Sequence, residues 1–180
     1  MLLDYLYEIP DARRGQGKMF ELPHLLFFSI LAIASGANSY RKIVIFIEEN
    51  LEVLSKSCGI RWKRKPSYGT IRNAISRMNQ KEAEKAFRKW SKESAKFENG
   101  KWKTVSLDGK ALKHSFDNVA DQRFKQMLSA FSSETNLILA HEKIGVSKEK
   151  ETDAAIKLVK ELKLDHVVYT LDALHTQKKR

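Results

Sequence analysis

Two aspartates that each follow a short strand-like segment are the residues best suited to chemistry in this chain. Asp108 follows residues 102–107 and Asp172 follows residues 167–171, and both segments are rich in the β-branched and aromatic residues typical of strands. If the two strands lie side by side, their carboxylates meet and repel, and a hard cation such as Mg²⁺ relieves that repulsion by binding carboxylate oxygens. Because bound divalent ions activate hydroxyl nucleophiles and steady leaving oxygens, the pair indicates phosphodiester chemistry.

Each part of this pattern also has a structural interpretation, and the residues alone leave both open. Asp108-Gly109 is a common turn dipeptide, so we expect the first strand to deliver Asp108 onto a glycine turn. Asp172 is a candidate helix N-cap, and His175 is a candidate surface or capping residue. Lysines near the carboxylates could hold a phosphate backbone, although lysine-rich surfaces are commonly just solvated. These lysines are Lys110, Lys113 and Lys148.

The first half of the chain has the pattern of a helical domain, which we assign to residues 1–98. Pro23 suits the first turn of a helix that runs to Ala34 and stops at Gly36. Ser39 and Ser67 are N-cap candidates for two further helices. These two could form a helix-turn-helix, although packing alone explains them equally well. The helices predicted after Gly36 cover residues 39–57, 67–78 and 81–97.

The second half has the pattern of a mixed sheet, which we assign to residues 99–180. Polar residues 132–136 join two apolar runs in the manner of a β-hairpin. A helical period then leads into a last strand, and such a crossover returns the chain parallel to an earlier strand. Reactive crevices lie beyond the carboxyl ends of parallel strands, so we predict an α+β fold that brings Asp108 and Asp172 together. The predicted strands are residues 102–108, 124–131, 137–144 and 166–171, with a helix over 151–163.

The composition favours a polyanionic partner in a reducing compartment. Lys and Arg number 33 against 22 Asp and Glu, which gives a formal net charge of +11 and favours nucleic acid as a partner. Cys58 is the only cysteine, which excludes an intramolecular disulfide and a cysteine zinc site and fits an intracellular protein. The longest apolar run, residues 25–34, is far short of the ~20 residues of a spanning helix, so we expect no membrane partner.

Beyond these patterns, two segments carry a resemblance to a known family. Residues 106–115 resemble the signature around Asp-Gly-Lys in DDE transposases of the H-repeat-associated class of bacterial insertion sequences, and residues 170–177 resemble their Asp-Ala-x-His-Thr-Gln signature. Residues 148–151 resemble a third segment, with Lys150 where the family has Asn. The resemblance extends over nearly the whole chain. Further matching segments are residues 11–14, 66–71 and 128–131.

The resemblance implies an RNase H-like catalytic fold that cleaves and joins DNA strands at transposon ends with Mg²⁺ or Mn²⁺. It implies that Asp108 and Asp172 are the first two catalytic acids and metal ligands, and that the helical domain binds DNA or assembles. It further implies double-stranded DNA as the partner, a homo-oligomer, and a nucleoid-associated protein of the bacterial cytoplasm. The residues expected to contact DNA are Lys110, Lys113, Lys148, His175 and Gln177.

The sequence departs from the family pattern in its third acid. Family members continue past the second aspartate to a helix that carries this acid, whereas the present chain stops at Arg180, and Glu151 precedes Asp172 in chain order. We therefore expect a truncated form with weak or no activity unless another chain supplies the acid. One alternative is a non-catalytic DNA-binding protein that occupies transposon ends or inhibits the full-length enzyme. A second is an RNase H-like nuclease unrelated to transposition.

Overall fold

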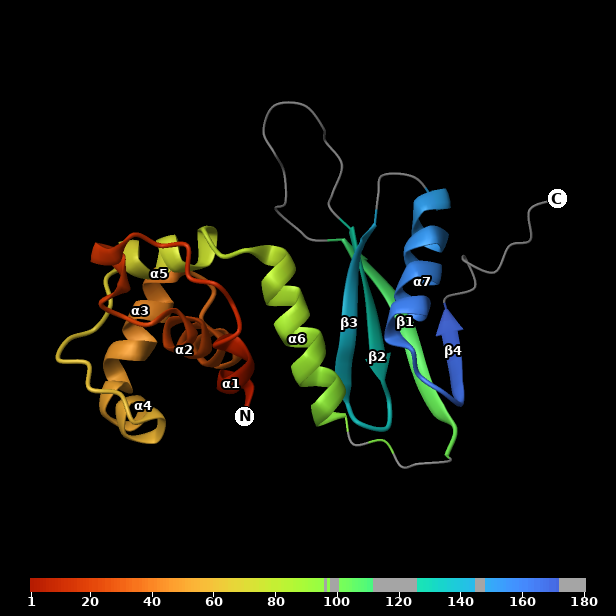
Figure 1. Cartoon of the computed structure of the whole chain (residues 1–180), viewed down its shortest axis with the longest axis horizontal. Coiled ribbons are helices and arrows are strands. Elements are labelled where there is room, and N and C mark those ends of the chain that lie inside the picture. The colour runs from red at the N-terminus through yellow and green to blue at the C-terminus, as the bar shows by residue number, and fades with distance from the viewer. Residues whose placement is uncertain (96, 98–100, 112–125, 145–147, 172–180) are drawn as a thin grey trace. The chain divides into compact units, whose positions relative to one another are not determined.

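The computed structural model of the chain describes residues 1–95, 97, 101–111, 126–144 and 148–171 (Figure 1). They divide into two compact units, Met1–Ala86 and Phe87–Arg180, with the boundary inside helix α6 (Gln80–Ser94). The first unit is helical and the second contains a sheet covered by a helix. The chain is thus an α+β protein, as the sequence predicts.

The first unit is built from short helices whose ends are fixed by the predicted caps. Ser39 Oγ accepts a hydrogen bond from Lys42 N at 3.3 Å, and Ser67 Oγ accepts one from Thr70 N at 3.2 Å. Gly59 ends a helix in the left-handed conformation, with φ of 66°, which glycine adopts at little cost. The elements are α1 (Leu2–Leu6), a 3₁₀ turn (Gly15–Lys18), α2 (Leu22–Ala34), α3 (Tyr40–Glu49), α4 (Leu51–Cys58) and α5 (Tyr68–Ser76).

One predicted helix is divided in two. The continuous helix expected over residues 39–57 is interrupted at Asn50, where α3 ends and α4 begins. The Asn50 side-chain amide donates a hydrogen bond to the Phe46 carbonyl at 2.8 Å. The Asn50 N–H donates to the same carbonyl at 3.1 Å, so the side chain adds a second hydrogen bond at the end of α3. This local bond favours a helix end at Asn50, where φ of −109° and ψ of 11° leave the helical range, although the apolar stripe continues.

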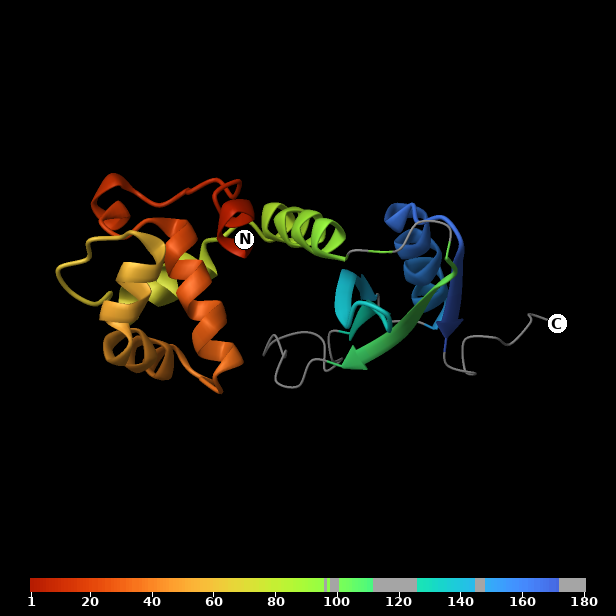
Figure 2. The same ribbon diagram turned by 90° about the horizontal axis from the view of Figure 1, so that it is seen from below.

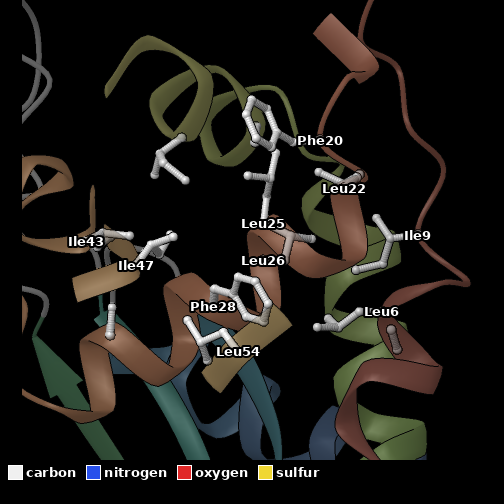
Figure 3. Close-up of a cluster of buried hydrophobic side chains, with 14 residues drawn as sticks. Leu6, Ile9, Phe20, Leu22, Leu25, Leu26, Phe28, Ile43, Ile47 and Leu54 are labelled. Atoms are coloured by element: carbon white, nitrogen blue, oxygen red, sulfur yellow. The ribbon is translucent and has the colours of Figure 1, made fainter. Parts of the chain in front are cut away.

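Helix α2 lies at the centre of the core of the first unit (Figure 3). Its residues Leu25 and Phe28 are fully buried, as are Ile47 of α3 and Ile71 of α5. A helix that is apolar on most of its circumference is buried by neighbours on several sides, and α1, α3 and α5 supply them. Within the part of the chain that the structure describes, no helix is long and apolar enough to cross a membrane.

The second unit holds a four-stranded sheet in the order β3-β2-β1-β4. Strands β1 and β2 pair antiparallel, as do β2 and β3, whereas β4 lies parallel to β1 after the crossover through α7. The predicted hairpin is therefore confirmed, and so is the parallel return of the last strand. The bounds are β1 (Lys103–Ala111), β2 (Gln126–Ser132), β3 (Leu137–Ile144), α7 (Lys148–Leu162) and β4 (Val167–Leu171).

Helix α7 covers one face of this sheet (Figures 1 and 2). Leu158 of α7, Val105 of β1 and Leu128 of β2 are fully buried in a common apolar cluster. Strand residues of the opposite parity, including Ser106 and Ser129, lie on the other face because successive side chains alternate. The helix and the cluster thus fix the strands that carry the residues discussed next.

Candidate active site at Asp108

Asp108 lies within β1, on the sheet face opposite to α7. Its neighbour Leu107 is buried in the cluster beneath α7, so alternation turns Asp108 to the other face. Its side chain is 63% exposed, and its Oδ2 atom lies 3.7 Å from Lys110 Nζ. Because both groups are exposed and the distance is long, this pair contributes little stability and leaves the carboxylate available to a ligand.

The predicted glycine turn after Asp108 is wrong. Strand β1 continues through Gly109 to Ala111, and Gly109 lies opposite Leu128 of β2. The antiparallel ladder with β2 supplies backbone partners for residues 108–111, so the chain has no reason to turn there. Asp108 is therefore held inside a paired strand, which positions it more firmly than a turn would.

On the other side of β1, the parallel ladder with β4 ends just before the aspartate. The last paired residues are Leu107 and Leu171, and the preceding pair, Ser106 and Thr170, is joined by a hydrogen bond of 2.9 Å between their hydroxyls. In the sequence, the residue after each member of the last pair is an aspartate. Asp172 lies outside the described residues, so its meeting with Asp108 stays a prediction.

Two polar residues that sequence reasoning missed lie in the same row across the sheet as Asp108. Ser129 of β2 is opposite Asp108, and His141 of β3 is opposite Ser129. Ser129 Oγ and His141 Nδ1 are 3.1 Å apart, within hydrogen-bonding distance. The ring of Phe87 from α6 stacks on the His141 imidazole, with ring centroids 5.4 Å apart and planes inclined by 17°. The face beside Asp108 therefore carries an ordered hydroxyl–imidazole pair.

A β-bulge creates this row. The hairpin register pairs Phe131 with Ile138 but Ala130 with Ala140, so Leu139 is the extra residue. Without the bulge, Ser129 would lie opposite Ala140 rather than His141. The sequence carries no local signal for such a bulge, which explains why the pair was not predicted.

The remaining predicted site residues divide into two groups. Lys110 is described and lies beside Asp108, whereas Lys148 begins α7 with a side chain outside the described residues. The others, Lys113, His175 and Gln177, also lie outside the described part of the chain. Their contacts with DNA stay predictions.

The Asp108 carboxylate is a suitable ligand for a divalent cation. The Asp108 carboxylate offers exposed oxygen atoms, the ligand type that Mg²⁺ prefers. Within residues 1–95, 97, 101–111, 126–144 and 148–171, no three His, Cys, Asp or Glu side chains gather into a metal cluster. The second carboxylate ligand is the role predicted for Asp172, which lies outside these ranges.

One protein family matches the first half of the chain. The family model described as DDE_Tnp_1-associated matches residues 3–91. No solved structure matches.

Relatives in Escherichia coli extend the similarity over almost the whole chain. A protein of strain K12 named "Putative transposase YncI" is 33% identical over 98% of this chain and 70% of its own length. A protein of the same name in O157:H7 is 34% identical over 98% of this chain and 44% of its own length. The K12 protein named "H repeat-associated putative transposase YhhI" is 27% identical, over 98% of this chain and 46% of its own length. The chain thus spans less than half of two of these three relatives.

Proposed function

Because this chain belongs to the H repeat-associated family of DDE transposases, we propose that Asp108 and Asp172 form a Mg²⁺ site for cleaving and transferring DNA strands at insertion-sequence ends. Double-stranded DNA is the proposed substrate. The formal net charge of +11 supports a polyanionic substrate, since neutralising phosphates releases their counterions.

The observation that carries the proposal is the parallel register of β1 and β4. The ladder ends with Leu107 opposite Leu171, and an aspartate follows each of these leucines in the sequence. Neighbouring strands lie about 4.8 Å apart. Two carboxylates at that spacing can share an ion whose ligand distances are about 2.1 Å.

The sheet order supports an RNase H-like catalytic fold. In such a fold, the antiparallel strands β1, β2 and β3 are followed by a helix and by a strand that returns parallel to β1. The order β3-β2-β1-β4 and the crossover through α7 agree with this arrangement. This arrangement matters for the mechanism because the first and second acids would then follow from two adjacent strands, β1 and β4.

The residues of the proposed site would have different roles. Asp108 and Asp172 would hold the cation, which when bound activates a hydroxyl nucleophile and stabilises the leaving oxygen of the phosphodiester. Lys110 Nζ, 3.7 Å from the Asp108 carboxylate, can turn from that weak pair to a phosphate oxygen. Ser129 and His141 line the same sheet face and would border the bound strand. We assign no third acid among the 180 residues.

Iron-directed cleavage of bound DNA tests this proposal without requiring turnover. Fe²⁺ in place of Mg²⁺ generates hydroxyl radicals in ascorbate and peroxide, and these cut DNA close to the ion. Wild-type protein on a labelled duplex should direct cuts that excess Mg²⁺ suppresses. The double variant Asp108→Asn, Asp172→Asn should lose them, whereas Asp153→Asn, an exposed acid on α7, should retain them.

A different outcome would favour the non-catalytic alternative. If all three proteins bind the duplex equally and none directs metal-dependent cutting, the chain binds DNA without a metal site at Asp108. Preferential cutting of an RNA–DNA hybrid over duplex DNA would instead favour an RNase H-like nuclease.

A further inference from the structure

The positive charge of the helical unit is concentrated in a single stretch. Residues 53–81 contain eight Lys or Arg and no Asp or Glu, whereas residues 1–52 and 82–86 contain six Lys or Arg and nine Asp or Glu. A separation of this kind produces a positive surface on an otherwise acidic unit. The eight residues are Lys56, Arg61, Lys63, Arg64, Lys65, Arg72, Arg77 and Lys81.

The centre of this stretch is a loop between α4 and α5, residues 60–66, which we call the basic loop. Trp62 anchors it, with its ring edge-on to Phe20 at 4.8 Å and to Phe28 at 5.3 Å between centroids. Pro66 is fully buried at the other end of the loop. A loop anchored at two points is already ordered, so a ligand that binds it loses little free energy in ordering the backbone.

The basic side chains on either side of Trp62 point to solvent. Arg61, Lys63 and Arg64 are all exposed. Lys65 forms an ion pair with Glu48 of α3, and Arg64 Nη2 donates to the Met19 sulfur at 3.3 Å.

No carboxylate within the described ranges forms an ion pair with Arg61, Lys63 or Arg64. The charges of these three residues are therefore available to an external anion.

Helix α5 extends the positive surface from the end of the loop. Ile71 and Ala74 face the core, and the exposed side carries Arg72 and the polar residue Asn73. Arg72 lies four residues into the helix, about 6 Å along its axis from the first residue at a rise of 1.5 Å per residue. Loop and helix thus contribute four exposed cations, Arg61, Lys63, Arg64 and Arg72, to a surface suited to a polyanion such as duplex DNA, which carries one charge per about 1.7 Å of axis.

We propose that the basic loop, together with Arg72 of α5, binds the phosphate backbone of double-stranded DNA. This surface belongs to the helical unit and is distinct in the chain from Asp108, which lies in the other unit. The inference rests on the proposed function in one respect, since both require DNA as the ligand. It assigns the helical unit a part in holding DNA.

Salt-dependent binding of a labelled DNA duplex tests this surface. Fluorescence anisotropy gives the affinity at several salt concentrations for wild type and for the triple variant Arg61→Gln, Lys63→Gln, Arg64→Gln. Losing three phosphate contacts should make the slope of log K against log salt shallower by about 2 to 3. The affinity near 100 mM salt should fall roughly 10- to 100-fold.

Two further variants serve as controls. The matched control Lys18→Gln, Arg41→Gln, Lys42→Gln removes three exposed charges from the same unit outside residues 53–81 and should leave the slope nearly unchanged. The variant Arg61→Lys, Arg64→Lys keeps the charge and should keep the slope, which separates lost contacts from misfolding.

The outcomes distinguish this inference from the proposed function. If wild type binds DNA and the triple variant shows the same slope, the basic loop is not the binding surface, while the proposed function stands. If wild type binds no duplex even at low salt, the proposed function itself fails. Tighter binding of duplex RNA through the same three cations would overturn DNA as the partner.

Discussion

Replacing Leu158 by alanine should loosen the sheet that carries Asp108. Leu158 of α7 is fully buried in the apolar cluster between α7 and the sheet. Removing such a leucine leaves a cavity and typically costs about 3 kcal/mol. Ile156 lies on the same helix with its side chain 49% exposed, so Ile156→Ala should change the free energy of unfolding by less than about 0.5 kcal/mol.

Hydrogen exchange followed by mass spectrometry can measure the loss of stability caused by Leu158→Ala separately for each unit. A loss of about 3 kcal/mol should speed the exchange of the slowest amides in β1, β2 and β3 roughly 150-fold, because each 1.36 kcal/mol is a factor of ten. Peptides from α2 should be unaffected, because α2 belongs to the other compact unit. Equal effects of the two substitutions would refute the packing described for α7, whereas acceleration of α2 as large as that of the sheet would show that the two units unfold together.

Two smaller predictions concern the edges of the sheet. In a double-mutant cycle, Ser106→Ala and Thr170→Val should show a coupling of about 0.5 kcal/mol in urea unfolding, since they remove an exposed 2.9 Å hydrogen bond; additive effects would show that the bond does not join β1 to β4. Burial raises the pKa of Glu134, but hydrogen bonds from Thr104 N and the Ser132 hydroxyl outweigh it and hold this pKa below its usual value. The carboxylate therefore contributes stability that is fully present above its unfolded pKa and is lost as pH falls through the lower folded pKa. Glu134→Gln should accordingly flatten the acid side of the stability–pH profile, and an unchanged profile would contradict these contacts.

Local patterns in the sequence predict most helices and strands correctly. They fail where pairing with a strand distant in the sequence determines how far a strand extends. Ser39 and Ser67 cap helices as their side-chain chemistry requires, and the hairpin forms around residues 132–136. The strand β1 runs past Gly109 only because β2 pairs with it, and β2 is distant in sequence. A dipeptide rule cannot detect that partner.

The candidate site shows the same division. The strand character before Asp108 and Asp172 is local, so the sequence indicates both positions. The row from Asp108 through Ser129 to His141 depends on the bulge between Ala130 and Phe131, which shifts one strand by a residue. A shift of one residue changes which side chains face each other, and alternation alone does not predict it.

Mn²⁺ uptake by single-site variants tests the central claim most directly. Electron paramagnetic resonance of free Mn²⁺ reports how much ion the protein removes from solution. Wild type and Asp153→Asn should take up Mn²⁺ at a site that Asp108→Asn and Asp172→Asn each lose, since either change removes one of the two proposed carboxylate ligands. Uptake that is the same in wild type and in both site variants would show that Asp108 and Asp172 do not share a metal ion.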